Sequence, residues 1–461
     1  MIMDISPQRL RAAYRSGGRK PSEVIEHLLS RFVDEDQQGV WISTVAVDRL
    51  RASAREMDTR LNELDEFPLL GLPFSVKDCI DVAGEVTTAA CPEFSYLAEH
   101  SSPVVQRAID CGAIYIGKTN MDQFATGLVG TRSPYGTARN PYNPLYIPGG
   151  SSSGSAVSVA TGTSSFSLGT DTGGSGRVPA SYCGVTGLKP APGALSRRGM
   201  VSACRSFDTI SLYTASADDG LEVFRHLLAY DPADCWSDDA YALQEVGAEA
   251  TSMRIATPRS EDLCFFGDTE TPDLFMRGQT VAESHFGPLA KIDFSAFTEV
   301  NDLMFFGPFV AERDVSVGTF LDSNPGAGID VVRSLIVGSR THTAADAYRA
   351  YYRLKEARHA LKAFWQQYDV LMVPTVGSVL SLDDVASEPL QTSFNNGYYT
   401  NFANPLQLAA VAVPSQVTSS GVPFGVTFLG PAGTEAKLAN VASQFVAACT
   451  MASSTAQRQS A

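Results

Sequence analysis

The chain has 461 residues, of which 44% are hydrophobic and 18% are charged, as in ordinary globular proteins and unlike disordered ones. Its formal net charge of -15 is spread along the sequence, which argues against nucleic acid as a partner, because a nucleic-acid binder needs a basic face. This length exceeds what one small hydrophobic core supports, so a large α/β domain or two domains are expected.

The eight cysteines are widely scattered, without a CxxC pair or a Cys/His spacing. They predict reduced thiols rather than a disulfide framework or a zinc site. The N-terminus has no signal-peptide profile, and no apolar run reaches the length of a membrane span. We therefore expect a soluble, cytoplasmic protein that does not bind a membrane. The sequence leaves open whether the chain forms a homodimer.

The first 66 residues are predicted to be helical, because apolar residues recur there at three- and four-residue spacing. The predicted helices are residues 9–14, 22–33 and 46–64. From Leu69 the period changes, and buried strands are expected at residues 72–76 and 113–116. A predicted helix at residues 103–110 lies between these strands, which makes a βαβ unit.

Residues 148–176 are dominated by Gly, Ser, Thr and Ala, with a short helix expected at residues 156–161. Apolar side chains such as Val157 and Phe166 are interspersed, which favours a buried, close-packed segment over a flexible linker. Further along, the predicted helices are 216–228 and 343–368, and the predicted strands are 370–374 and 423–429. The tail, residues 452–461, is expected to be frayed.

Three short motifs match other enzyme classes, but each lacks what that chemistry requires. Residues 112–119 fit the phosphate-loop pattern, yet their middle is an apolar β run rather than a loop. Residues 171–173 match the aspartic-protease triplet, which needs a second such triplet. Residues 150–154 fit the nucleophile-elbow pattern, whose serine needs a late histidine base, and the candidates His342 and His359 lie in helical, charged stretches.

A lysine and two serines form a constellation that needs no histidine. A serine hydroxyl requires a base at neutral pH, and a lysine can serve if burial favours its neutral amine. Lys77 follows an apolar predicted strand in a region with few other charges, and Ser151 and Ser175 each end a Gly-Gly-Ser turn. The alternative for Lys77 is a surface ion pair with Asp78 or Asp81.

The two Gly-Gly-Ser turns have a physical reason of their own. Successive glycines permit positive φ and close backbone approach, and they let neighbouring N–H groups point into one cavity, as an oxyanion hole requires. The natural donors are the N–H groups of Thr172, Gly173, Gly174 and Ser175. The alternative interpretation is a pair of ordinary glycine-rich turns.

This constellation resembles the amidase signature family, and the resemblance runs from about residue 20 to residue 450. Lys77 matches the family lysine, Ser151 the serine that follows a cis peptide bond, and Ser175 the nucleophile. The residues that would support them structurally are Gly150, Asp171 and Arg177.

The resemblance implies an α/β fold with a central mixed β-sheet flanked by helices on both faces. It also implies hydrolysis of a small amide through an acyl-enzyme, without a metal or organic cofactor. We expect one amidase domain over residues 1–461. Its parts would be a helical N-terminal segment (1–66), a catalytic core (67–215), and a variable segment with the C-terminal part of the same domain (216–450).

Within the family, several stretches resemble the allophanate hydrolases, whose substrate is a urea that carries a carboxylate. These stretches are residues 118–136, 203–208 and 307–313. The resemblance implies that Arg313 binds this carboxylate and that Gly127 and Phe305 also contact the substrate. Without the resemblance, Arg313 could equally pair with Glu312 or another surface carboxylate.

Two departures from that subgroup keep other functions open. Phe305 stands where the subgroup has a substrate-contacting tyrosine, so a hydroxyl is lost and the substrate could differ. The chain is also expected to end near the boundary of the amidase domain, without the smaller C-terminal domain of full-length allophanate hydrolases. The alternatives are an amidase for another small amide, and a partner-dependent protein of the amidotransferase type.

Overall fold

The structure is a computed structural model that describes residues 3–34, 37–245, 253–305 and 307–459. Its strands are β1 (Trp41–Thr44), β2 (Pro73–Lys77), β3 (Val86–Thr87), β4 (Tyr96–Leu97), β5 (Ile114–Thr119), β6 (Phe166–Asp171), β7 (Thr186–Lys189), β8 (Thr209–Thr214), β9 (Ile255–Pro258), β10 (Ala290–Ile292), β11 (Val370–Pro374), β12 (Ala409–Val417) and β13 (Pro423–Gly430). Its α-helices are α1 (Pro7–Arg15), α2 (Pro21–Arg31), α3 (Val47–Thr59), α4 (Pro103–Asp110), α5 (Ser153–Ala160), α6 (Val178–Cys183), α7 (Ala217–Leu227), α8 (Thr271–Phe286), α9 (Ser295–Phe305), α10 (Glu312–Ser323), α11 (Asp330–Gly338), α12 (Ala344–Gln367), α13 (Leu382–Ser387), α14 (Gln391–Gly397) and α15 (Glu435–Gln459).

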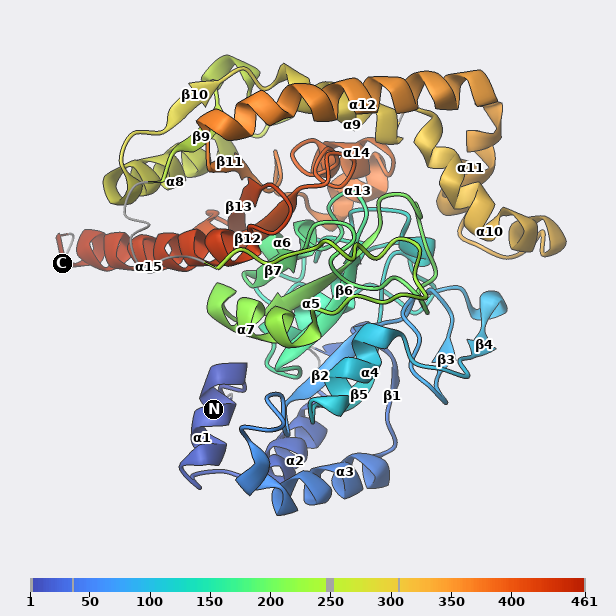
Figure 1. The fold of residues 1–461 in the computed structure, drawn as a ribbon, viewed down its shortest axis with the longest axis vertical. Helices are drawn as coiled ribbons and strands as arrows, with labels where there is room; N and C mark the ends of the chain where they lie inside the picture. The colour runs from blue at the N-terminus through green and yellow to red at the C-terminus, as the bar shows by residue number, and fades with distance from the viewer. Residues whose placement is uncertain (1–2, 35–36, 246–252, 306, 460–461) are drawn as a thin grey trace.

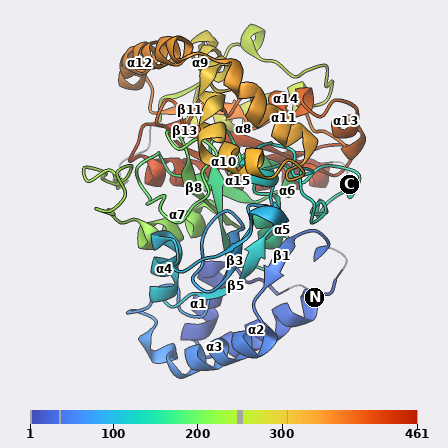
Figure 2. The ribbon, with the colours of Figure 1, turned by 90° about the vertical axis from the view of Figure 1, so that its right-hand side faces the viewer.

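One mixed sheet of 11 strands runs through the molecule (Figures 1 and 2). Its order is β1-β5-β2-β6-β8-β7-β12-β13-β11-β9-β10. Strand β2 pairs in parallel with both β5 and β6, whereas β7, β8, β12 and β13 pair antiparallel. Because neighbouring parallel strands end at one edge of a sheet, the ends of β2, β5 and β6 meet there.

Helices cover both faces of this sheet. Successive residues of a strand point to opposite faces. In β7, a Cβ at Gly187 would lie 2.8 Å from the Ala180 side chain of α6, whereas Leu188 lies beside Gly220 of α7. Helices α6 and α7 therefore pack on opposite faces, and the prediction of a mixed sheet flanked on both sides is confirmed. The N-terminal helices α1–α3 lie at one end of the molecule and α9 and α12 at the other (Figure 2).

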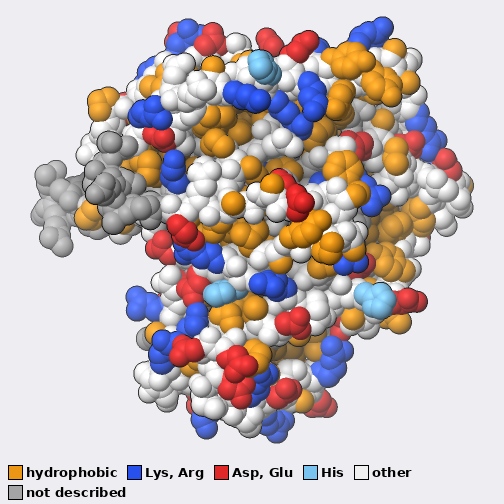
Figure 3. Space-filling model, in the orientation of Figure 1, with side chains coloured by type: hydrophobic (Ala, Val, Ile, Leu, Met, Phe, Trp, Pro, Cys, Tyr) orange, Lys and Arg blue, Asp and Glu red, His pale blue; other side chains and the backbone are white. Residues whose placement is uncertain are grey.

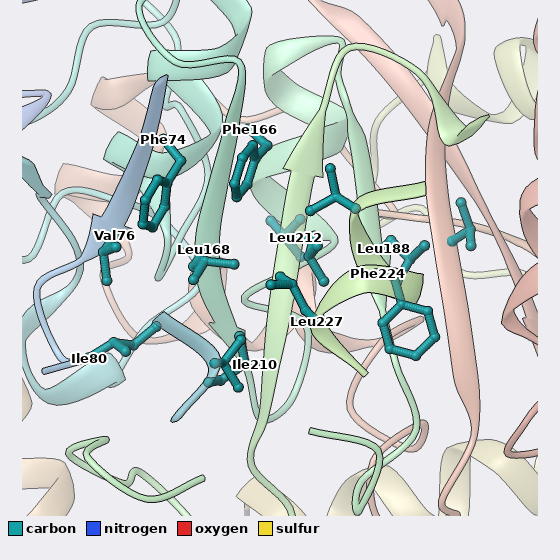
Figure 4. Packing of buried hydrophobic residues seen from close by; sticks show 14 of the residues in the cluster. Phe74, Val76, Ile80, Phe166, Leu168, Leu188, Ile210, Leu212, Phe224 and Leu227 are labelled. Atoms are coloured by element: carbon teal, nitrogen blue, oxygen red, sulfur yellow. The ribbon is translucent and has the colours of Figure 1, made fainter. Parts of the chain in front are cut away.

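The core between the central strands is apolar and closely packed (Figure 4). Phe74 of β2 stands directly opposite Phe166 of β6, and their rings stack with centroids 5.1 Å apart. Along β2, Phe74 and Val76 belong to this core, while Ser75 and Lys77 alternate with them and reach hydroxyl groups instead. The period of two in β2 thus directs Lys77 away from the apolar core.

Most predicted elements of the described chain are confirmed to within a few residues. Strand β1 lies within the region predicted to be helical. Other elements were not predicted: strands β3, β4, β6 to β10 and β12, and helices α6, α8 to α11, α13 and α14. Helix α15 continues through Gln459, so most of the tail expected to fray is helical; the last two residues lie outside the described part.

The surface in view carries interspersed charges of both signs (Figure 3). In the described part of the chain, no helix has the length and apolar character that crossing a bilayer requires.

Candidate active site

A continuous chain of side-chain contacts joins Lys77, Ser151 and Ser175, the three residues that the sequence singled out (hereafter the triad). The Lys77 Nζ lies 2.8 Å from the Ser151 Oγ, and the Ser151 Oγ lies 2.8 Å from the Ser175 Oγ. Both distances are normal for hydrogen bonds. Lys77 ends β2, whereas Ser151 and Ser175 stand just before α5 and just after β6. The sheet edge therefore collects residues that are up to 98 positions apart in the chain.

Lys77 is fully buried, so the alternative of a surface ion pair with Asp78 or Asp81 is wrong. Its amine contacts two hydroxyls, that of Ser151 and, at 2.7 Å, that of Thr170. Burial lowers the pKa of Lys77 from its usual value, and Cys79, followed by more remote carboxylates, opposes this shift. Desolvation favours the neutral amine, which is the form that can accept a proton.

The peptide bond between Gly150 and Ser151 is cis, as the resemblance implied. A carboxylate packs directly against this turn: a Cβ added at Gly150 would lie 2.0 Å from the Asp122 Oδ2, which only glycine avoids. The same carboxylate accepts from the backbone N–H groups of Gly130, at 3.0 Å, and Arg132, at 2.9 Å. The Asp122 N–H in turn donates to the Ser151 carbonyl at 3.0 Å. Asp122 thus holds the loop that contains Gly130 and Arg132 against the turn that carries Ser151.

A buried ion pair shapes the turn that carries Ser175. The Arg177 guanidinium donates two hydrogen bonds of 2.9 Å to the Asp171 carboxylate. This carboxylate also accepts from the N–H groups of Gly174, at 2.9 Å, and Gly176, at 3.0 Å. Burial alone would raise the pKa of Asp171, but Arg177 outweighs it and holds the pKa below its usual value. The ionised carboxylate therefore fixes the backbone on both sides of Ser175.

The backbone around Ser175 narrows the set of candidate oxyanion donors. The Gly174 N–H is already donated to Asp171. Among the described residues, no acceptor takes the N–H groups of Thr172, Gly173 or Ser175. Gly174 has a φ of +133°, and a Cβ there would lie 2.2 Å from the Thr400 Oγ1, so glycine is required. Gly174 is thus needed for the shape of the turn, and three of the four expected donors remain.

Arg313 is the second residue of helix α10, and its side chain is buried. Its Nη1 lies 3.0 Å from the Cys204 Sγ. The neighbouring Glu312 accepts from the Ser206 N–H at 2.8 Å. Gly127 lies in the loop that Asp122 organises. Phe305 ends α9, and its side chain lies outside the described part of the structure.

The phosphate-loop, aspartic-protease and nucleophile-elbow motifs found in the sequence do not form the corresponding sites in the structure. Residues 114–119 are strand β5, and Lys118 bonds to Thr87 at 3.0 Å instead of closing a phosphate loop. Asp171 is paired with Arg177. The elbow serine, Ser152, donates to the Thr170 carbonyl at 3.1 Å, while His359 is exposed on α12.

Sequence reasoning missed four residues that hold the site together: Asp122, Thr170, Thr400 and Asn404. Thr170 directly precedes Asp171 in the motif, so its position was a usable signal. The Thr400 hydroxyl donates to the Gly173 carbonyl at 2.7 Å, and the Asn404 amide donates to the Asp171 carbonyl at 2.6 Å. These last two come from a segment more than 220 residues further along the chain, and no local pattern marks them.

Comparison with known proteins identifies the relatives of this chain. The urea amidolyase of Saccharomyces cerevisiae is 36% identical over 432 residues, which are 93% of this chain and 23% of that protein. The chain therefore spans less than a quarter of the length of this relative. One component of the glutamyl-tRNA(Gln) amidotransferase from a Synechococcus species is 32% identical over 471 residues, covering 94% of this chain and 95% of that component.

Solved structures agree with this relationship. The structure of Kluyveromyces lactis allophanate hydrolase is 35% identical and superposes with a TM-score of 0.90, covering 97% of this chain and 73% of that one. A sequence model of the family described as Amidase matches residues 23–439, which is most of the chain. The chain belongs to the amidase family.

Proposed function

We propose that the chain hydrolyses allophanate (urea-1-carboxylate), or a close carboxylated urea, and releases ammonia. The observation that carries the proposal is the unbroken contact from the buried amine of Lys77 through Ser151 to Ser175, at 2.8 Å for each step. An amine of lowered pKa at the end of two hydroxyls is a base positioned to activate the outer one.

In the first half of the reaction, Ser175 is the nucleophile. Its Oγ attacks the amide carbonyl carbon, its proton passes to the Ser151 Oγ, and the Ser151 proton passes to the neutral amine of Lys77. The carbonyl electron pair moves to the oxygen, which accepts from the N–H groups of Thr172, Gly173 and Ser175. Thr170 accepts an N–H of the amine, and the lone pair of the neutral amine is then free to accept the Ser151 proton.

In the second half, the tetrahedral intermediate collapses and the carbon–nitrogen bond breaks. Ser151 delivers its proton to the leaving nitrogen and is reprotonated by Lys77, so ammonia departs and an acyl ester on Ser175 remains. Water then attacks this ester, with the same relay accepting its proton. From allophanate the products are ammonia and N-carboxycarbamate.

The charge around the site favours an anionic substrate. Arg313 and Arg132 are both buried, and they lie near enough for the charge of Arg313 to lower the pKa of Arg132, although burial is the larger cause. Arg132 belongs to the loop that Asp122 holds against the Ser151 turn. Guanidinium groups bind carboxylates in two-point geometry, so we take these two arginines as the candidate contacts of a substrate carboxylate. The similarity to allophanate hydrolase and urea amidolyase supports the same substrate class.

An amidotransferase-type role is the second candidate, because the chain covers nearly the whole of the Synechococcus amidotransferase component. That role predicts Ser175-dependent release of ammonia from glutamine only when a partner protein is added. A third outcome, hydrolysis of another small neutral amide, would follow if Phe305 makes the pocket less polar.

The test is ammonia release from allophanate, biuret, glutamine and propanamide by purified wild type and by Ser175→Ala. We expect the wild type to act on allophanate with the highest kcat/KM and the variant to lose at least about 10³-fold. Ser155→Ala is the matched control, because Ser155 is a buried serine of the same stretch that bonds to Thr119 rather than to the triad.

Each other result has a defined meaning. Ser175-dependent release from biuret or propanamide, but not from allophanate, would contradict the substrate and leave the mechanism standing. Activity that survives in Ser175→Ala would overturn the mechanism itself.

A further inference from the structure

The loop 202–208 connects two parts of the site that are far apart in the chain. On one side, residues 309–316 contact it at five points. These are Arg313 Nη1 to Cys204 Sγ (3.0 Å), Cys204 Sγ to the Phe309 carbonyl (3.6 Å), Ser206 N–H to Glu312 Oε2 (2.8 Å), Ser316 Oγ to the Ser202 carbonyl (2.6 Å), and the rings of Phe207 and Phe309 (centroids 5.0 Å apart). The position of Arg313 therefore depends on where this loop lies.

On its other side, Asp208 connects the same loop to residues 171–176, the turn that carries Ser175 (hereafter the oxyanion turn). The Asp208 carboxylate is almost fully buried and accepts from the N–H groups of Ala203, at 2.9 Å, and Cys204, at 3.1 Å. It also accepts a hydrogen bond from the Thr172 hydroxyl. One carboxylate thus holds both the peptide that carries the Cys204 thiol and a residue of the turn before Ser175.

A second link makes this connection rigid. The Asn404 amide donates to the Asp171 carbonyl at 2.6 Å and to the Phe207 carbonyl at 2.9 Å. The loop and the oxyanion turn are therefore joined at two adjacent points, and a shift of either must break buried hydrogen bonds.

The Cys204 thiol orients Arg313 without neutralising it. Burial raises the pKa of Cys204 to about 12, so the sulfur stays a neutral thiol. It receives the guanidinium on one side and donates to the Phe309 carbonyl at 3.6 Å on the other. The thiol is a neutral acceptor, so it helps to fix the direction of the guanidinium without adding to the negative charge that Asp208 and Glu312 already place near Arg313.

We propose that Asp208 is a positioning residue that sets the separation between Arg313 and the oxyanion donors at Thr172 and Gly173, with Cys204 as its contact to Arg313. This inference rests on the proposed function. It adds that the site selects amides whose carboxylate lies at one fixed, short distance from the scissile carbonyl, and that the loop 202–208 determines this distance.

The test measures binding without turnover, in the Ser175→Ala background. Malonamate has the length of allophanate with a methylene group in place of the central nitrogen, and malonamide is its neutral counterpart. Calorimetric titration with both ligands gives the preference for the carboxylate as a ratio of Kd values. We expect malonamate to bind at least about 10-fold more tightly than malonamide, as one charge-assisted contact provides.

Asp208→Asn in this background should remove most of that preference. The asparagine amide keeps one acceptor oxygen but places an NH₂ group against the Ala203 N–H. The hydrogen bond that holds this end of the loop 202–208 in position is therefore lost. We expect malonamate affinity to fall about 10-fold and malonamide affinity to change less than about 3-fold. The control is Asp231→Asn, because Asp231 is a buried carboxylate that accepts from the Ser196 hydroxyl, at 2.7 Å, in another loop.

Cys204 provides a second pair of variants if Asp208→Asn does not fold, as judged by circular dichroism. Cys204→Ala removes one acceptor of Arg313 and should weaken the binding of malonamate alone, whereas Cys204→Ser restores an acceptor and should recover the preference. A merely structural effect would weaken both ligands equally in the alanine variant.

The outcomes separate this inference from the proposed function. If the Ser175→Ala protein prefers malonamate and both Asp208→Asn and Cys204→Ala keep that preference, the positioning role is overturned while the anionic substrate stands. If the Ser175→Ala protein shows no preference at all, the anionic substrate and the positioning role fall together.

Discussion

Two buried lysines on neighbouring strands of the same sheet have different surroundings. Lys77 ends β2, and Lys118 lies on β5 beside Val76, one residue away in register. Both side chains are fully buried. Lys118 faces the Asp78 carboxylate at 4.0 Å and donates to the Thr87 hydroxyl and a backbone carbonyl. Lys77 faces the hydroxyls of Ser151 and Thr170.

The different partners of these two lysines indicate that burial alone does not make a lysine a base. Desolvation lowers the pKa of both amines. The Asp78 carboxylate is the main group that opposes this shift at Lys118, whereas at Lys77 the main opposing group is Cys79, followed by carboxylates. An amine beside a carboxylate serves as a structural cation, whereas an amine among hydroxyls can exchange a proton. Replacing each lysine in turn should therefore have opposite consequences.

The largest expected effect is on activity in Lys77→Met. Methionine fills a similar volume but cannot accept a proton, so kcat should fall at least about 10³-fold. The free energy of unfolding should change by less than about 1 kcal/mol, because the lost contacts to two hydroxyls are offset by the removal of a buried amine. Ammonia release and urea denaturation measure the two quantities. A variant that kept a tenth of the activity would show that Lys77 is not the base.

Lys118→Met should show the reverse pattern. The substitution leaves the buried Asp78 carboxylate without its cation, and breaking a buried pair in this way costs about 3–5 kcal/mol. The activity of the folded fraction should stay within about 10-fold of wild type, since Lys118 does not contact the triad. Urea denaturation followed by fluorescence, with activity measured below the transition, checks both parts. Equal losses of activity in the two lysine variants would contradict the assignment of Lys77 as the base and Lys118 as a structural cation.

The stability and the activity should both depend on pH through the amine of Lys77. The folded pKa of Lys77 is lowered below its usual 10.5, so the unfolded chain binds more protons between the two values, and stability rises with pH there. The difference in unfolding free energy between wild type and Lys77→Met should therefore increase with pH, by at most about 1.4 kcal/mol per unit. The rate kcat/KM should rise through the folded pKa, with a midpoint below 10.5. A rate that falls with pH in this range would be inconsistent with a neutral amine as base.

The smallest expected effect is that of Thr170→Val, which keeps the shape of the side chain but removes the second hydroxyl beside Lys77. Losing one buried hydrogen bond should lower kcat about 5- to 30-fold and stability by about 1 kcal/mol. The matched control is Ser167→Ala on the same strand, whose hydroxyl contacts Ser75 rather than Lys77. If both variants lose the same activity, Thr170 has no particular role in directing the amine.

Much of the site could be predicted from the sequence because its chemistry is concentrated in two short motifs. The serines and glycines of residues 149–151 and 173–175 are adjacent in the chain, and their backbone requirements are visible as glycine. Strand β2 is equally local, since its period of two sets Lys77 apart from Phe74 and Val76. In contrast, β1 has only four residues, lies within a helical region and shows no alternation of buried and exposed side chains, so its pairing with β5 could not be predicted from periodicity. The extent of the domain and the substrate contact of Phe305 stay predictions.

The sequence singled out the residues that we propose carry the chemistry: a lysine after an apolar strand and two serines in glycine turns, to which the family resemblance added Arg313. Tertiary structure alone decided which lysine meets hydroxyls and which meets a carboxylate, because that choice depends on strand register and on Asp78 and Ser151 arriving from different loops. It also decided that Thr400, Asn404 and Asp208 support the oxyanion turn. The physical reason is that burial and hydrogen-bond partners are properties of the packed chain, and they set the pKa and the position of each group that the sequence supplies.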